Sequence, residues 1–162
     1  PNCTPKKEKN TLTDLLNYEL DNRAVIANAY PCHRLDRETS GLIVYAKGKK
    51  AQQLMMEEFK KRRIKKSYIA FVKGAVRKNA DTIKSYLHNV NKNRDEIAIT
   101  KYRVIERKKD FSVLAVEPVT GRTNQIRIQL KEIGHPLLGE RVYAFRKDFK
   151  LKFKRVAISF KK

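Results

Sequence analysis

Residues 100–118 read TKYRVIERKKDFSVLAVEP. Two runs within this stretch, 100–107 and 111–118, are rich in the β-branched and aromatic residues that favour strands. The polar segment 108–110 between them is typical of a short turn. The stretch therefore predicts a hairpin, and a hairpin of this kind builds an antiparallel sheet.

Further strands and helices are predicted on both sides of this hairpin. Thr11 and Asp14 have the spacing of a helix capping box, and Gly134 followed by Pro136 ends the last predicted helix. Strands outnumber helices, which predicts an α+β fold with a mainly antiparallel, mixed sheet flanked by helices. The predicted strands are 41–47 (buried), 67–77 and 155–160; the helical stripes are Leu12, Leu15, Leu16 and Leu20, then Ala51, Leu54, Met55 and Phe59 within 50–62, then Ile126, Leu130 and Ile133 within 124–133.

The composition is that of a folded, strongly basic protein. Of 162 residues, 38 are Lys or Arg and 17 are Asp or Glu, which gives a formal net charge of +21. An excess of this size indicates a polyanionic partner, because cations that neutralise phosphates release counterions. A basic surface that only maintains solubility is the alternative.

Cysteines and histidines are few and dispersed. Two cysteines and three histidines, none at metal-ligand spacing, predict reduced thiols, no metal and a cytoplasmic location. No apolar run is long enough to span a bilayer, so no membrane association is expected.

Segment 78–99 is polar and contains four asparagines. We expect it to form an exposed excursion from the fold. Its basic residues could contact RNA, and a plain surface loop fits the pattern equally well. Residues 1–10 are also polar and are expected to be loose.

The first candidate for chemistry is Asp36, within His33-Arg34-Leu35-Asp36-Arg37-Glu38-Thr39-Ser40-Gly41. Neighbouring cations favour the ionised form of a carboxylate. An ionised carboxylate at the junction of a loop and a strand can serve as a nucleophile or a base. An aspartate that only stabilises a turn through a salt bridge is the alternative.

The second candidate is Gly121-Arg122-Thr123-Asn124-Gln125-Ile126-Arg127. A glycine turn here opens a helix whose first turn carries two arginines and two amides. Helix N-termini bind anions, so this segment predicts a phosphate or carboxylate site. Arg127 follows the inward Ile126 and is expected at the rim of the core, although a solvated arginine fits as well.

The third candidate is Tyr68, in Lys66-Ser67-Tyr68 at the start of a predicted strand. Taken alone, it fits an aromatic residue packed on the core.

In this order, the segments resemble the RluA-type family of RNA pseudouridine synthases. The family's HRLDxxTSGL signature is complete at 33–42, and its P-x-TGRTHQIRxHL signature appears at 118–130 as PVTGRTNQIRIQL. GHPLLGE at 134–140, Tyr143 and the closing RVAI at 155–158 are also similar to the family. Asn124 and Gln129 stand where histidines are common in the family, and Glu140 where an aspartate is common.

The resemblance implies the pseudouridine synthase fold with a central catalytic cleft, as a single catalytic domain over residues 1–162. It also implies that this domain is short at its N-terminus relative to the family: either the opening strands are missing from this sequence, or the sheet is shorter than in the family. The implied activity is that of an isomerase, an intramolecular transferase that converts uridine in rRNA or tRNA into pseudouridine after flipping the base. No cofactor, an RNA partner and a monomer are expected.

Site residues follow from the same resemblance. Asp36 matches the catalytic aspartate, Arg127 the arginine that pairs with it, and Tyr68 the tyrosine that stacks on the uracil. Whether Asp36 attacks the sugar, attacks the base or removes a proton is left open. The implied RNA- or substrate-binding residues are His33, Arg34, Arg37, Arg122 and Ile158. A non-catalytic basic RNA-binding protein and an inactive family member are the alternatives.

Overall fold

The computed structural model describes residues 11–36 and 38–143, in two compact units. The N-terminal unit comprises Pro1–Arg37 and Gly41–Ile64, and the C-terminal unit comprises Glu38–Ser40 and Lys65–Lys162. The strand predicted at 155–160, the loose segment 1–10, Arg37 and Ile158 lie outside the described residues. The α+β class with antiparallel sheets is confirmed.

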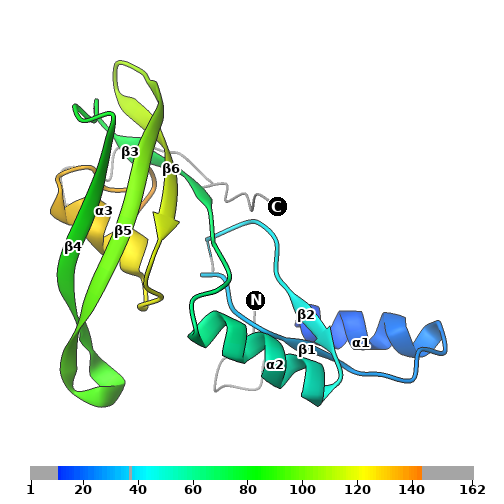
Figure 1. Cartoon of the computed structure of the whole chain (residues 1–162). Helices are drawn as coiled ribbons and strands as arrows, with labels where there is room; N and C mark the ends of the chain where they lie inside the picture. Colours follow the sequence, from blue (N-terminus) through cyan, green and yellow to red (C-terminus); the bar gives the residue numbers. More distant parts are fainter. Residues whose placement is uncertain (1–10, 37, 144–162) are drawn as a thin grey trace. The chain divides into compact units, whose positions relative to one another are not determined.

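The N-terminal unit contains two helices and a short antiparallel strand pair (Figure 1). Its first helix begins as the sequence predicts, because the Thr11 and Asp14 side chains each bond to the other's backbone N–H. The elements are α1 (Leu12–Asn22), β1 (Ala29–Pro31), β2 (Tyr45–Lys47) and α2 (Lys49–Lys60).

Polar contacts tie both helices to this strand pair. The Asn17 side chain accepts from the Ala29 N–H at 2.6 Å and donates to the Ala29 carbonyl at 3.3 Å. Gln52 of α2 donates to the Pro31 carbonyl at 2.8 Å. Backbone groups of a three-residue strand are thereby satisfied by side chains, which compensates for the shortness of the pair.

Two details of the N-terminal unit differ from the prediction. The strand predicted at 41–47 covers only its last three residues, because β1 offers only three partners, and Leu42 is 63% exposed. In α2, Met55 and Phe59 are half-buried as expected, but Ala51 and Leu54 face solvent. The inward stripe is completed by the polar Gln52.

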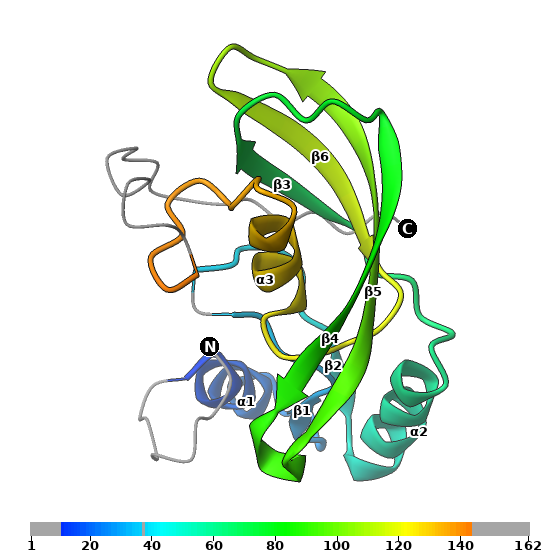
Figure 2. The same cartoon turned by 90° about the vertical axis from the view of Figure 1, so that its left-hand side faces the viewer.

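The C-terminal unit is a four-stranded antiparallel sheet with one helix packed on it. Strand order is β3-β6-β5-β4, and α3 lies against one face of the sheet (Figure 2). The elements are β3 (Tyr68–Lys73), β4 (Ala80–Asn89), η1 (Val90–Lys92), β5 (Arg94–Arg107), β6 (Phe111–Pro118) and α3 (Gln125–Glu132). The predicted hairpin at 100–118 is confirmed as the β5–β6 pair, with an irregularity between Val104 and Glu106.

The expectation of an exposed excursion at 78–99 is met only in part, because the segment is largely exposed but has regular structure that belongs to the sheet. This segment forms β4, the short 3-10 helix η1 and the first part of β5. Ile83 and Leu87 alternate with exposed Lys84 and Tyr86, which is the two-residue period of a strand with one face in solvent. The four asparagines gave the segment the composition of a loop, although they lie at or beyond the ends of β4 and leave its alternating pattern intact.

The core of the C-terminal unit lies between the sheet and α3. Leu130 and Leu114 are fully buried there, and Gly134 with a φ of 83° ends the helix as predicted. Ile133, expected to face inward, is 36% exposed. The buried cluster consists of Ala70, Val72, Val76, Ile83, Tyr102, Leu114, Val116 and Leu130. None of the helices within 11–36 and 38–143 has the length and apolar character that a membrane span requires.

Replacing Leu130 by alanine tests this core. We expect Leu130→Ala to lower the free energy of unfolding by about 2–5 kcal/mol, because it leaves a cavity between α3 and the sheet. Ile133→Ala, just after the same helix, should cost about 1 kcal/mol or less. Urea unfolding of both variants measures the difference, and equal losses would contradict the packing described.

Candidate functional site

Asp36 lies in the loop between β1 and β2, and hydrogen bonds close the base of that loop. The Cys32 N–H donates to the Val44 carbonyl at 2.9 Å, and the Val44 N–H donates to His33 Nε2 at 3.0 Å. Asp36 itself is half-buried. Two hydrogen bonds beyond the β1–β2 pair thus restrain the loop that carries the candidate carboxylate.

His33 has a structural role in this loop. Its Nε2 accepts a backbone hydrogen bond, and its ring lies 5.2 Å from the Phe59 ring of α2, centroid to centroid. Arg34 is exposed, as a residue that contacts a partner must be. The binding roles expected of both residues stay predictions.

Tyr68 opens β3 opposite Val116 and packs, half-buried, against the core cluster. Two residues earlier, burial lowers the pKa of Lys66. A Cβ atom added at Gly121 would come within 3.3 Å of Lys66 Nζ. The segment Lys66–Tyr68 and the glycine of the second motif therefore lie side by side.

A buried amide fixes the turn of the second motif. Gln125 Oε1 accepts from Thr120 Oγ1 at 2.7 Å and from the Arg122 N–H at 3.0 Å. Its Nε2 donates to the Ile99 carbonyl at 2.9 Å and to Thr100 Oγ1 at 2.7 Å. All four contacts lie within the protein, so this residue joins the turn, the helix start and β5.

Arg127, on α3, binds a carboxylate of its own unit. Its Nε and Nη2 donate to the two oxygens of Glu140 at 2.6 and 2.8 Å, and Nη1 donates to Asn124 Oδ1 at 2.9 Å. The guanidinium also lies 4.9 Å from the centroid of the Tyr143 ring. A planar, bidentate pair of this kind fixes the orientation of the arginine.

Glu140 is ionised in this setting. Burial alone would raise its pKa, but hydrogen bonds from Arg127 and from the N–H groups of Val142 and Tyr143 outweigh burial and lower it. A guanidinium has five N–H donors, so the pair with Glu140 does not exclude a second carboxylate. Pairing of Arg127 with Asp36 stays a prediction.

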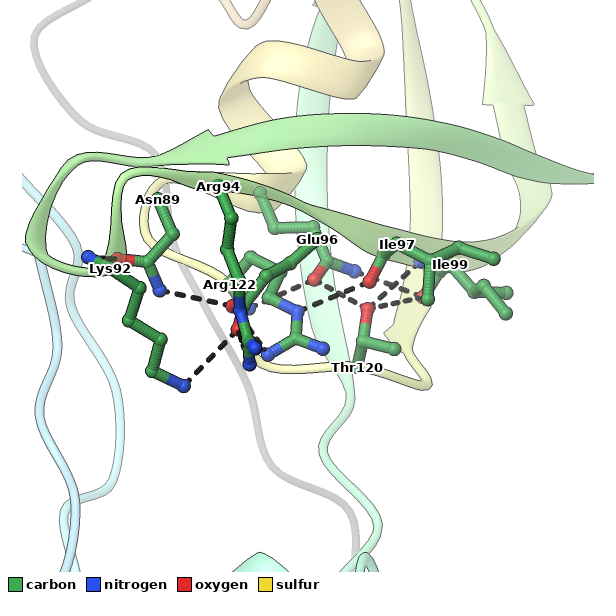
Figure 3. Close-up of polar contacts among 9 residues, drawn as sticks. Asn89, Lys92, Arg94, Glu96, Ile97, Ile99, Thr120 and Arg122 are labelled. Carbon is green, nitrogen blue, oxygen red and sulfur yellow. Dashed lines mark hydrogen bonds and ion pairs between the residues drawn. The ribbon is translucent and has the colours of Figure 1, made fainter.

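Arg122 is anchored to β5. Its Nη1 donates to Glu96 Oε2 at 2.9 Å and its Nε donates to the Ile97 carbonyl at 3.1 Å (Figure 3). The side chain is 27% exposed. The predicted anion-binding arginine therefore binds an anion of the protein itself.

Glu96 accepts hydrogen bonds from four side chains of the described residues. Asn89 and Arg122 donate to Oε2, and Lys92 and Arg94 donate to Oε1. Led by the hydrogen bonds of Asn89 and Lys92, and despite an opposing effect of burial, these contacts lower the pKa of Glu96 to about 2. A charged carboxylate is held between the tip of the β4–β5 hairpin and the second motif.

Sequence reasoning missed Glu96 as a member of this region. It also treated Asn124 and Glu140 only as departures from the family pattern, whereas both bind Arg127 directly. The position of Glu140 and Tyr143 just after the GHP segment was a usable signal. Glu96 gave no signal that links it to the second motif, because its partner in that motif, Arg122, lies 26 residues away in the sequence.

Among the residues that the structure describes, no group of three or more His, Cys, Asp or Glu side chains is placed to hold a metal ion. The candidate residues are divided between the units, with Asp36 in the N-terminal unit and Tyr68 and Arg127 in the C-terminal unit.

Known proteins share these motifs and this fold. A model of the RNA pseudouridylate synthase family matches residues 2–132. The chain belongs to this family. The match includes Asp36, Tyr68 and Arg127 and reaches into both compact units, and the predicted family is confirmed.

Two bacterial relatives indicate the RluA-type branch of the RNA pseudouridylate synthase family. The chain is 39% identical to ribosomal large subunit pseudouridine synthase D of Borreliella burgdorferi over 129 residues, which is 74% of this chain and 39% of that protein. It is 33% identical to the dual-specificity RNA pseudouridine synthase RluA of Vibrio cholerae over 121 residues, 69% of this chain and 49% of that protein. The chain thus spans less than half the length of either relative.

A solved structure of the family supports the fold. Human RNA pseudouridylate synthase domain containing 1 superposes with a TM-score of 0.76 at 26% identity, covering 91% of this chain and 67% of that one. The antiparallel sheet and helices described above therefore have the fold of the RNA pseudouridylate synthase family.

The low pKa of Glu96 predicts a pH dependence of stability. Its folded pKa of about 2 lies below the ordinary 4.5, so its contribution is present above pH 4.5 and is lost as the pH falls toward 2. We expect Glu96→Gln to destabilise the protein at pH 5–7 and to approach wild-type stability in the window where the pH falls from 4.5 toward 2. Urea unfolding at successive pH values measures this, and a constant difference across the window would contradict it.

The Arg127–Glu140 pair can be measured by a double-mutant cycle. Arg127→Met, Glu140→Gln and the double variant should give a coupling energy of about 1–3 kcal/mol, because both partners are largely buried. The exposed pair Arg23–Glu19 serves as a control, expected at about 0.5 kcal/mol. Equal coupling energies for the two pairs would contradict a larger contribution of the buried, bidentate Arg127–Glu140 pair to stability.

Proposed function

We propose that this protein converts uridine in RNA into pseudouridine, with Asp36 as the catalytic carboxylate. The observation that carries the proposal is membership of the RNA pseudouridylate synthase family with a complete HRLDRETSGL signature around Asp36. The half-buried position of Asp36 in a restrained loop supports it, because a carboxylate used in chemistry must be both held and accessible.

The reaction breaks the N1–C1′ bond of uridine and forms a C5–C1′ bond to the same sugar. The proton on C5 is lost and N1 gains a proton, so the product is an isomer of the substrate and the balance requires no redox partner or cofactor. The uracil must leave its stack first, which costs a few kcal/mol and less in a loop.

We assign the following roles to the side chains. Asp36 acts on the sugar or the base. Arg127 is assigned the pairing with Asp36, because a planar guanidinium can hold a carboxylate in fixed geometry. Tyr68, half-buried at the start of β3, stacks on the flipped uracil. The exposed Arg34 contacts the RNA where the base has left.

The proposal treats both compact units as parts of one catalytic domain. The family match covers parts of both units, and the candidate residues are divided between them. The RNA partner fits the net charge of +21. An rRNA or tRNA target, a monomer and a cytoplasmic location stay predictions.

Replacing Asp36 tests the proposal. We expect Asp36→Asn to reduce pseudouridine formation by at least about a thousand-fold, since the side chain keeps its shape but loses its charge. RNA binding should stay within a few-fold of wild type. Carbodiimide adduct mapping of total cellular RNA treated with each protein measures formation, and a labelled RNA measures binding.

Asp21→Asn, an exposed carboxylate of α1, is the matched control and should keep full activity. Turnover by Asp36→Asn, or no turnover by the wild type on any cellular RNA, would contradict the proposed function. Binding without turnover by the wild type would instead favour a non-catalytic RNA-binding protein.

A further inference from the structure

The β4–β5 hairpin extends beyond the rest of its sheet. β5 pairs with β6 from Thr100 to Arg107, whereas its first residues, 94–99, pair with β4. Both views show this two-stranded ribbon continuing past the end of β6 (Figures 1 and 2). We call residues 85–98 the hairpin arm.

The tip of the hairpin arm has a defined conformation. The Asn89 side chain accepts from the Lys92 N–H at 3.2 Å, which caps the short helix η1, and Asn93 takes a left-handed conformation with a φ of 45°. The Asn89 amide also donates to Glu96 at 3.0 Å. Side chains at this tip are therefore ordered by the protein before any partner arrives.

Lys92 and Arg94 are held next to one another at this tip. Lys92 Nζ lies 3.1 Å and Arg94 Nη2 3.2 Å from the same oxygen, Oε1 of Glu96 (Figure 3). Both cations remain open to solvent, with 55% and 65% of their side chains exposed, whereas the Glu96 side chain is only 7% exposed.

Positive charge is in excess at this cluster. Lys92, Arg94 and Arg122 surround the single carboxylate of Glu96, so one of three cations is neutralised within the group. The nearest acid in the sequence, Asp95, pairs with His88 at 2.9 Å on the other face of the arm. A surplus of exposed cations around a covered anion attracts an anion from solution.

We propose that Lys92 and Arg94, positioned by Glu96, form a phosphate-binding site for the backbone of the substrate RNA. This inference rests on the proposed function, because it takes the RNA to be the substrate. An ammonium and a guanidinium side by side can each contact one of two successive phosphates of the strand, and such contacts add affinity without reading sequence. Arg122 links the site to the turn that leads to Arg127.

The test is the salt dependence of RNA binding. Each phosphate contact to a single strand contributes about 0.7 to the slope of log affinity against log salt concentration. Lys92→Ala/Arg94→Ala should therefore reduce the magnitude of that slope by about 1.4 and weaken binding about ten-fold near 0.1 M salt. The probe is a fluorescently labelled single-stranded oligouridine, titrated at several salt concentrations.

Lys78→Ala/Lys108→Ala is the control for net charge. These two lysines are exposed, each pairs with one carboxylate, and they lie at the opposite end of the same two strands. β4 has ten residues, so about 30 Å of extended strand separates its two ends. This variant removes the same charge and should change the slope by less than about 0.5.

Lys92→Arg/Arg94→Lys keeps both charges and should bind like the wild type. On cellular RNA, the alanine variant should raise KM about ten-fold and leave kcat unchanged, since the site binds the backbone and not the reacting base. The inference is overturned by a wild-type slope in the alanine variant, by an equal loss in the lysine control, or by an equal loss in the charge-keeping variant.

Failure of the inference and failure of the proposed function give different results. A wild-type protein that forms no pseudouridine contradicts the function whatever its salt slope. A protein that forms pseudouridine with the same KM and salt slope in the alanine variant contradicts only the phosphate site.

Discussion

The packing of α3 against the four-stranded sheet is the constraint on which the C-terminal unit depends. Leu130 buries its side chain in the cluster formed by β3, β4, β5 and β6. On the same helix, Gln129 donates to the Ala98 carbonyl at 3.0 Å and to Ser85 Oγ at 3.0 Å, so α3 is also bonded to β4 and β5. An apolar contact alone would let the helix slide, whereas buried amides bind it at particular backbone groups.

That fixed helix determines where the second motif can act. Gln125 is bonded to β5, and Leu130 lies in the core. Arg127 lies between these two anchored residues on α3 and is held at the rim of the core, with a quarter of its side chain exposed. The two arginines of the second motif bind different carboxylates. Glu140 orients Arg127, and Glu96 orients Arg122, so each arginine of the motif has its own buried acid.

This arrangement explains why a strongly basic protein keeps acids inside its polar clusters. A buried carboxylate can bind several cations and prevents them from separating in response to mutual repulsion. Glu96 does this at the hairpin tip, where Lys92 and Arg94 stay exposed. The positive charges of Lys92 and Arg94 are thereby held close together at the hairpin tip.

The sequence by itself determined the family, the α+β class, the capped first helix, the β5–β6 hairpin and the end of α3. All of these depend on neighbours within about twenty residues, whose spacing is visible in the chain. Only the tertiary structure decided that 78–99 builds two strands, that Leu54 faces solvent, and that Arg122 and Arg127 bind Glu96 and Glu140. In each case the outcome depends on which other element lies beside the side chain and covers it or satisfies its charge, and the spacing of residues along the chain does not show which element that is.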